Sequence, residues 1–337
     1  MTRAFHLSAR TEEFPMSTLR LAGQLALALA TAAAFAQPRD FPQRPIRVVV
    51  PVPPGGSVDA TARLLAPKLS ESLGQQVVID NRAGASTNIG MEVVARAPGD
   101  GYTLLANTAP LVANPALFPK LGFTPEKDFA PISLVVNGPV VVVAHPSLPV
   151  RDLQGLVRLA KAKPGAINYS SSGAGTLTHL GAELFKYISG ANLVHVPYKG
   201  GGPAMASTIG GETEVTFQTP LAAVGHIQSG RLRALAVTSG KRLAMLPELP
   251  TTTEAGMPRF DFQTWVGLLA PASTPTPVIR LLNEHVVKAA RSPDVAERFS
   301  REGADVVGST PEAFRKVIAE ETALWARVIR EMGIKAE

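Results

Sequence analysis

"NYSSSGAGTLTHLGAELF", residues 168–185, places a glycine-rich turn between a strand pattern and a helix pattern. The strand-like segment 167–169 runs into Ser-Ser-Ser-Gly-Ala-Gly-Thr, and apolar residues at helical spacing follow at once. Free backbone N–H groups and the positive end of a helix dipole meet at such a turn. The stretch therefore predicts a place where an anion is held.

Strand and helix patterns alternate along the rest of the chain. Buried-strand patterns occur at 46–51, 77–80, 102–106, 140–145, 194–198, 214–218, 232–238 and 265–271. Helices are expected through 62–69, from 88 toward 97, at 153–163, from 200 onward, and at 277–290, 293–301 and 311–332. This alternation predicts an α/β fold with parallel sheets built from right-handed βαβ units. Two βα-rich halves, with a crossing strand on each side, indicate two lobes and a cleft between them.

The size and composition are those of a globular protein of two domains. The chain has 337 residues, of which 45% are apolar and 18% charged, and it has no cysteine. The absence of cysteine excludes a disulfide framework, a thiol nucleophile and a lipid-anchor cysteine.

The N-terminus has the pattern of a secretory signal peptide. Arg20 precedes an apolar run at 21–36 that ends in Ala-Phe-Ala, a cleavage pattern before Gln37. We therefore expect residues 1–36 to be a signal peptide cleaved after Ala36, with an uncleaved anchor as the alternative. Met16 resembles the natural start of this signal, so residues 1–15 are interpreted as a mis-assigned extension.

Two further glycine loops repeat the pattern of the opening stretch. Gly55-Gly56-Ser57, the loop 84–88 and the loop 171–176 each end a strand and open a helix. In a parallel α/β sheet these strand ends line the ligand crevice. The segment 173–178 reads G-x-G-x-x-T, which lacks the third glycine of a dinucleotide fingerprint, and no P-loop occurs.

Catalytic motifs are missing from the sequence. It contains no G-x-S-x-G, S-x-x-K or H-E-x-x-H, and its six histidines include no i,i+4 pair. Ser57 or Ser172 would need a nearby base, for which His179 is the candidate. The plainer interpretation is that Thr176 or Ser172 caps the helix and that His179 is exposed. An exported serine-type hydrolase using Ser172 or Ser57 stays open as the alternative function.

The charge pattern favours a small anionic ligand. Without residues 1–36 the chain has 30 Lys and Arg against 25 Asp and Glu, a net charge of +5. Because no aromatic-interleaved basic block appears, we expect no nucleic-acid partner. Residues 53–58, 83–90 and 170–178 contain no Lys or Arg, so the loops offer N–H and hydroxyl groups alone. Such loops suit capture of a carboxylate better than phosphoryl transfer, which uses Lys, Arg or Mg²⁺.

Six segments together resemble one family. They are "PVPPGGSVDATARLLAPKLSESLGQQVVIDNRAG", "STNIGMEVVARAPGDGYTLL", "NYSSSGAGTLTHLGAELF", "VHVPYKGGGPA", "LRALAVTS" and "GLLAPASTPTPV". They are similar to the Bug family, the TctC-type extracytoplasmic solute receptors of tripartite tricarboxylate transporters, over essentially all of residues 38–337. The resemblance implies a two-lobed type II periplasmic binding-protein fold, with two crossing strands that form a hinge. It also implies a small carboxylate ligand and delivery of that ligand to integral-membrane transporter subunits.

The resemblance also implies the residues that contact the ligand. Carried over by position, they are Gly55, Gly56, Ser57, Ser86, Thr87, Asn88 and Thr108 in the first lobe, and Ser172, Gly175, Thr176 and His179 in the second. Gln218 is added because it follows Phe217, where the family often has Asp. The chain also has Val52 where an aromatic is common, and Arg-Ala-Gly-Ala-Ser-Thr-Asn at 82–88 in place of Arg-Pro-Gly-Ala-Gly-Gly-Asn.

For four residues a structural role is the alternative to ligand contact. Asn88 would then only cap its helix, Tyr198 and Trp265 would only pack, and Gln218 would be a satisfied buried amide.

The expected organisation follows from these observations. We predict a first lobe of residues 37–138 plus 255–337 and a second lobe of residues 139–254, with hinges near 137–138 and 254–260. We expect a periplasmic monomer without catalytic residue, metal or cofactor.

Overall fold

The computed structural model describes residues 41–118, 120–301 and 303–335. Residues from Arg44 onward form one compact unit of their own. The predicted signal peptide and its cleavage site lie outside the described residues. Within these residues, no helix combines the length and the apolar character needed to span a membrane.

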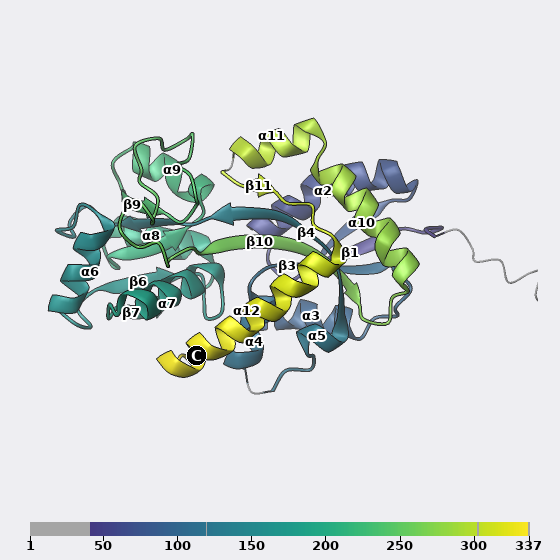
Figure 1. The fold of residues 1–337 in the computed structure, drawn as a ribbon, viewed down its shortest axis with the longest axis horizontal. Coiled ribbons are helices and arrows are strands. Elements are labelled where there is room, and N and C mark those ends of the chain that lie inside the picture. The colour runs from purple at the N-terminus through teal and green to yellow at the C-terminus, as the bar shows by residue number, and fades with distance from the viewer. Residues whose placement is uncertain (1–40, 119, 302, 336–337) are drawn as a thin grey trace, which may run out of the picture. The chain divides into compact units, whose positions relative to one another are not determined.

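The strands form two sheets (Figure 1). The six-stranded sheet has the order β11-β4-β10-β3-β1-β2. Its strands are β1 (Ile46–Val50), β2 (Val77–Asn81), β3 (Thr103–Asn107), β4 (Phe129–Pro139), β10 (Gln263–Pro271) and β11 (Asp305–Val306). The five-stranded sheet has the order β7-β6-β8-β5-β9. Its strands are β5 (Val141–Ala144), β6 (Asn168–Ser171), β7 (Val194–Pro197), β8 (Val215–Gln218) and β9 (Arg233–Val237).

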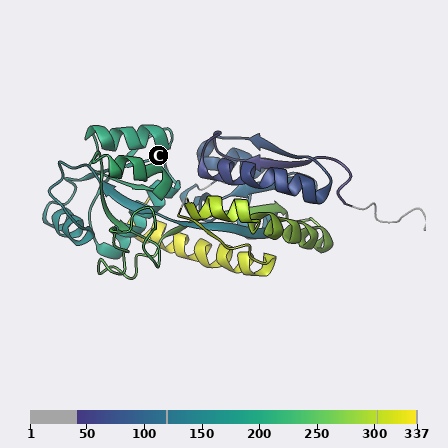
Figure 2. The same cartoon turned by 90° about the horizontal axis from the view of Figure 1, so that it is seen from above.

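Helices cover both faces of each sheet. Around the six-stranded sheet they are α2 (Ser57–Leu73), the short η1 (Ala85–Thr87), α3 (Asn88–Ala95), α4 (Pro110–Leu117), α5 (Pro125–Asp128), α10 (Thr276–Ala290), α11 (Pro293–Arg301) and α12 (Pro311–Met332). Around the five-stranded sheet they are α6 (Leu153–Ala162), α7 (Leu177–Ser189), α8 (Gly201–Gly210) and α9 (Pro220–Gln228). Figure 2 shows the two groups of elements by colour, with the five-stranded sheet in teal and green.

The sheets are mixed, which corrects the expectation of parallel sheets. Strands β1, β2 and β3 pair in parallel, as do β6, β7 and β8. The long strands β4 and β10 pair antiparallel with each other, and β5 is antiparallel to both of its neighbours. Strands β4, β5 and β10 also connect the two sheets: β4 leads through Val140 into β5, and the segment after β9 returns into β10. The predicted boundaries at 138/139 and 254/255 remain predictions.

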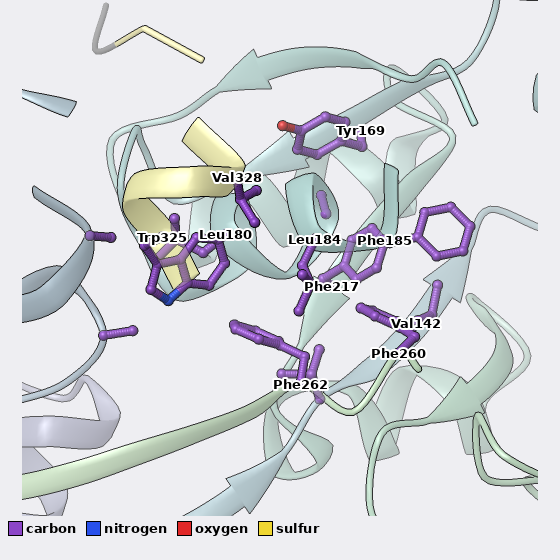
Figure 3. Packing of buried hydrophobic residues seen from close by; sticks show 14 of the residues in the cluster. Val142, Tyr169, Leu180, Leu184, Phe185, Phe217, Phe260, Phe262, Trp325 and Val328 are labelled. Atoms are coloured by element: carbon purple, nitrogen blue, oxygen red, sulfur yellow. The ribbon is translucent and has the colours of Figure 1, made fainter. Parts of the chain in front are cut away.

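Residues far apart in the sequence share one apolar core. Strand β5 alternates, with Val142 in the main cluster and Val141 and Val143 in a smaller cluster on the opposite face. Figure 3 shows aromatic rings of β6, α7, β8 and the segment before β10 packed together with α12. The ring of Phe262 meets that of Trp325 edge-on at 6.1 Å. The C-terminal helix therefore packs against α7, although it also covers β4 of the other sheet.

Local signals explain where the best-defined helices begin and end. The side chain of Thr310 accepts a hydrogen bond from Ala313 N at the start of α12, and left-handed Gly333 ends it. Asp152 caps α6 by accepting from Gly155 N at 2.6 Å. Both helices lie within one residue of the predicted ranges.

Candidate functional site

The loop between β1 and α2 is fixed by a buried carboxylate. Gly55 has a φ of +90° and its N–H donates to Asp59 Oδ2 at 2.9 Å. Asp59 is buried and also accepts from Arg63 Nε and Asn81 Nδ2. Burial alone would raise the pKa of Asp59, but these hydrogen bonds hold its pKa below the usual range. Gly56 and Ser57 stand at the first turn of α2, where backbone N–H groups have no partner within the helix.

The loop between β2 and α3 has a strained backbone. Ala85, Ser86 and Thr87 have φ values of +45°, +51° and +76°, and they are the non-glycine residues with positive φ among the residues described. The left-handed region is costly for side chains with a Cβ, above all for β-branched Thr. Such backbone persists only where the surrounding structure enforces it, and it gathers at ligand-binding and active sites.

Unpartnered polar atoms gather beside this loop. Within the described ranges, the buried side-chain atoms without a hydrogen-bond partner belong to Thr87, Asn107, Asn114, His226, Thr274 and Thr322. Thr87 lies in the strained loop, Asn107 ends β3, and Asn114 lies in α4. The amide Nδ2 of Asn114 reaches the loop directly, donating to Ser86 O at 2.7 Å and to Asn88 Oδ1 at 2.8 Å.

Two predicted residues here have structural partners. The side chain of Asn88 is buried and accepts from Asn114, and the residue at the N-cap of α3 is Thr87, so Asn88 is not the N-cap of its helix. Thr108 follows β3, shares a hydroxyl hydrogen bond with Thr264 at 3.2 Å, and donates its N–H to Asn107 Oδ1.

The loop between β6 and α7 satisfies its own polar groups. Its left-handed positions are glycines, Gly173 at +122° and Gly175 at +73°. Ser172 N donates to Thr178 Oγ1 at 2.8 Å, and Gly175 N donates to His179 Nδ1 at 3.0 Å.

The helix-cap interpretation of this loop is right for the position of Thr176 but wrong for a side-chain cap and for an exposed His179. Thr176 is the N-cap of α7 but its hydroxyl donates to Gly173 O, and it makes no side-chain cap hydrogen bond. Ser172 is not at the cap position. His179 is 2% exposed rather than on the surface, because its ring lies under the loop whose Gly175 N–H it accepts.

A pair of stacked imidazoles lies behind this loop. The ring of His179 stacks on that of His195 at 4.2 Å, and His195 Nε2 is 2.6 Å from Ser171 Oγ. Burial, with a smaller contribution from Lys186, lowers the pKa of His179 to about 4. Burial and then His179 lower the pKa of His195 to about 3. Both rings are therefore neutral at neutral pH.

Helix α4 of one sheet and the loop between β6 and α7 of the other approach each other at Asn114 and Gly175. A Cβ at Gly175 would lie 2.6 Å from Asn114 Oδ1 and 3.2 Å from Leu117 Cδ1. Gln218, at the end of β8, is buried and donates from Nε2 to Thr216 Oγ1 at 3.0 Å. A surface hollow of about 740 Å³ lies at 146–152 and 227–250 and is lined by none of the predicted site residues.

The geometry gives little support to the hydrolase alternative. The Ser172 hydroxyl accepts from Thr178 at 3.2 Å, while His179 Nδ1 is occupied by the loop backbone. Trp265 has the packing role that was the alternative to ligand contact. Its side chain is 2% exposed, meets Phe314 edge-on and donates a hydrogen bond to Glu321.

Comparison with known proteins identifies the family. A family profile described as "Tripartite tricarboxylate transporter family receptor" matches residues 61–334. This chain belongs to that family. BugT of Bordetella pertussis is 40% identical over 324 residues, which cover 95% of this chain and 99% of BugT.

Solved structures of the receptor family have the same fold. R. palustris Rpa4515 with adipate gives a TM-score of 0.79 at 35% identity and covers 88% of this chain and 99% of that chain. MatC (Rpa3494) from Rhodopseudomonas palustris with bound malate gives 0.77 at 32% identity, covering 86% and 100%. The receptor therefore has the two-lobed α/β fold of periplasmic binding proteins. The matched family consists of solute-binding receptors and not of enzymes.

Three residues of the region were missed by the sequence reasoning. Asp59 and Asn114 hold the loops, and Asn107 carries an unpartnered amide. A single Asn within the apolar segment 110–117 was the available signal for Asn114.

Proposed function

We propose that this protein captures a small carboxylate-bearing ligand between the strand-end loops of its two sheets and delivers it to the membrane subunits of a tripartite tricarboxylate transporter. The observation that supports this proposal most strongly is that loops of the two sheets come together at Asn114 and Gly175. These loops contain no Lys or Arg and are rich in N–H and hydroxyl groups. Hydrogen bonds of this kind to a charged group contribute about 1.5–3 kcal/mol each. Two similar receptors, with adipate and with malate, support a carboxylate.

The proposed contacts follow the loops. They are Gly55, Gly56, Ser57, Ser86, Thr87, Asn88 and Thr108 from one lobe, and Ser172, Gly175, Thr176, His179 and Gln218 from the other. Because Gly55 and Gly175 already donate their N–H groups to Asp59 and His179, their part is to shape the loop rather than to donate to the ligand.

The proposed setting is the periplasm, after cleavage behind Ala36, with the protein acting as a monomer. The lobes at 37–138 plus 255–337 and at 139–254 would close about hinges near 137–138 and 254–260. The connection between β4 and β5 and the segment before β10 supply such hinges, because each passes from one sheet to the other.

The proposed ligand is a di- or tricarboxylate or an aromatic acid rather than an amino acid. Gln218 is neutral, so a ligand ammonium beside it would lose its hydration without gaining a charge partner. Because Gln218 carries no negative charge, it also does not repel a second carboxylate group of the ligand.

The function is tested by isothermal titration calorimetry and native mass spectrometry with a panel of citrate, malate, adipate, benzoate, aspartate and glutamate. We expect stoichiometric binding of at least one of the four non-amino acids, with the ligand recovered intact. Recovery of chemically altered ligand over many turnovers would instead support the hydrolase alternative. If aspartate or glutamate binds and the other four acids do not, the argument from Gln218 is wrong.

A matched pair of glycine variants tests whether the two lobes close on the ligand. Gly175→Ala places a methyl group against Asn114, whereas Gly165→Ala has nearly the same φ (+74°) and nothing within 4 Å of its added Cβ. Both variants should lose about 1–2 kcal/mol of folding free energy from the left-handed backbone. Only Gly175→Ala should weaken binding, by at least about tenfold, which is about 1.4 kcal/mol. Equal affinities in the two variants would contradict closure at this contact.

A further inference from the structure

The amide orientation of Asn114 is fixed by its neighbours. One of its two donated hydrogen bonds goes to Ser86 O, a backbone carbonyl that can only accept, so the atom facing it must be Nδ2. Asn114 Oδ1 is then necessarily a hydrogen-bond acceptor on the other side of the amide. The residue is fully buried, and Oδ1 has no hydrogen-bond partner within the described ranges.

The opposite loop does not supply the missing donor. Gly175 faces Asn114 Oδ1 from the side of the second sheet, but its N–H already donates to His179 Nδ1. A buried carbonyl oxygen without a donor costs free energy, and native proteins rarely leave one unpaired. A donor for Asn114 Oδ1 would have to enter between the two loops, as a group of a bound ligand can.

A complementary donor lies on the neighbouring strand. Asn107 Oδ1 accepts the backbone N–H of Thr108 at 2.9 Å, which fixes its amide orientation as well. Its Nδ2 is buried and unpartnered, and Asn107 lies on the same face of β3 as Leu105, the face covered by the cluster that includes α3 and α4 residues. The unsatisfied groups are therefore a donor at Asn107, an acceptor at Asn114 and the hydroxyl of Thr87, which can act as either.

We propose that Asn114 Oδ1 accepts a hydrogen bond from a hydroxyl group of the ligand, so that the receptor selects hydroxycarboxylates over the same acids without the hydroxyl. This inference rests on the proposed function, that the ligand is a carboxylate. An ionised carboxylate has no proton to donate, so it satisfies Asn107 but not Asn114. A hydroxyl group both donates and accepts, and it satisfies Asn114 without bringing a charge.

An ammonium group is the other possible donor, and the loops disfavour it. Residues 53–58, 83–90 and 170–178 contain no Asp or Glu. Asp59, next to the first of these segments, is committed to Gly55, Arg63 and Asn81. A buried ammonium would thus lack a carboxylate partner.

The first experiment uses the unmodified protein and pairs of acids that differ by one hydroxyl group. Malate and succinate, citrate and tricarballylate, and mandelate and phenylacetate are titrated by calorimetry at one pH and ionic strength. In every pair that binds, we expect the hydroxy acid to bind at least tenfold tighter. Equal affinities within the bound pairs would overturn the inference and leave the carboxylate receptor intact. If no carboxylate binds, the proposed function fails and this inference fails with it.

The second experiment assigns the preference to Asn114. Asn114→Leu removes both the donors and the acceptor, and Asn283→Leu is its matched control. Asn283 also donates from Nδ2 to two backbone carbonyls, Ile132 O and Ser309 O, both at 2.8 Å, but lies in α10 away from the loops. The ratio of affinities within a pair should fall to below about twofold in Asn114→Leu and stay unchanged in Asn283→Leu.

A third variant covers the case in which Asn114→Leu does not fold. Asn114→Asp keeps an oxygen acceptor but loses both donated hydrogen bonds, to Ser86 O and Asn88 Oδ1. We expect weaker carboxylate binding overall, because the new charge repels the ligand, with the hydroxyl preference retained. Loss of the preference in Asn114→Asp, or its retention in folded Asn114→Leu, would overturn the role of Oδ1.

Discussion

The loops 84–88 and 171–176 have the same place on two different sheets but are built in opposite ways. Each connects the end of a parallel strand to the start of a helix. The loop 84–88 uses Ala85, Ser86 and Thr87 at positive φ, whereas the loop 171–176 uses glycines at its positive-φ positions. The first contains the unpartnered hydroxyl of Thr87 and contacts Asn114, whose Oδ1 is also unpartnered. In the second, Thr178 and His179 accept the backbone N–H groups of the loop.

Because the two loops are built differently, substitutions in them should affect different properties of the protein. The loop 171–176 is stable on its own hydrogen bonds and on buried neutral histidines, so changes there should lower the free energy of unfolding. The loop 84–88 stores strain and leaves polar groups unsatisfied, so changes there should cost little stability and should act on ligand binding.

Acid should destabilise the loop 171–176 through His179. The pKa of His179 is about 4 in the folded protein and about 6.5 in the unfolded chain, so the unfolded chain binds more protons between these values. The stability contributed by neutral His179 is present above about pH 6.5 and is lost as the pH falls toward 4. Between pH 7.5 and 4.5 the loss is expected to be roughly 2–3 kcal/mol.

The matched variant for this effect is His179→Asn, whose Oδ1 can replace Nδ1 as the acceptor for Gly175 N–H. Urea unfolding is measured at pH 7.5 and at pH 4.5. The free energy of unfolding should fall less on acidification in the variant than in wild type, by the roughly 2–3 kcal/mol attributed to His179. The neighbouring residues Glu183, Lys186 and His195 are present in both proteins. An identical pH dependence in the two proteins would show that His179 is not held neutral.

The same substitution in both loops should give different losses of stability. Thr178→Val removes the acceptor of Ser172 N–H and should cost about 1–3 kcal/mol of unfolding free energy. Thr87→Val removes a hydroxyl that has no partner, so its unfolding free energy should stay within about 0.5 kcal/mol of wild type. Thr178 and Thr87 are both buried, at 4% and 7% exposure. Their losses of unfolding free energy, measured by chemical denaturation, can therefore be compared directly. Equal losses would mean that the Thr87 hydroxyl has a partner after all.

Serine-to-glycine substitutions should change the free energy of unfolding in opposite directions in the two loops. These changes should be smaller than those expected for His179 and for Thr178. Ser86→Gly relieves a left-handed residue at φ +51° and should raise the free energy of unfolding by about 0.5–1 kcal/mol, despite the extra freedom of the unfolded chain. Ser172→Gly, at a position without positive φ, should lower it by about 0.5–1 kcal/mol. A loss in Ser86→Gly would show that the loop 84–88 is not strained there.

The regular elements were largely predictable because their signals are local. The ranges 293–301 and 311–332 coincide with α11 and α12, and most strands lie within two residues of their predicted ends. Strand β4 was missed because its prolines argue against a strand. Pro131 is tolerated next to a register shift between Leu268 and Leu269 of β10, where the ladder is interrupted. The antiparallel direction of β4 and β10 depends on how the chain returns between the sheets, which no local pattern encodes.

By itself, the sequence determined the α/β class, the glycine loops at the strand ends, the absence of cationic side chains in them and the receptor family. Periodicity and turn chemistry act over a few residues, so they can be read along the chain. Only the tertiary structure decided that Ala85, Ser86 and Thr87 are left-handed and that Asn114 joins loops of both sheets. Asn114 and Gly175 are far apart in the sequence, and the unpaired oxygen between them exists only once folding has buried both.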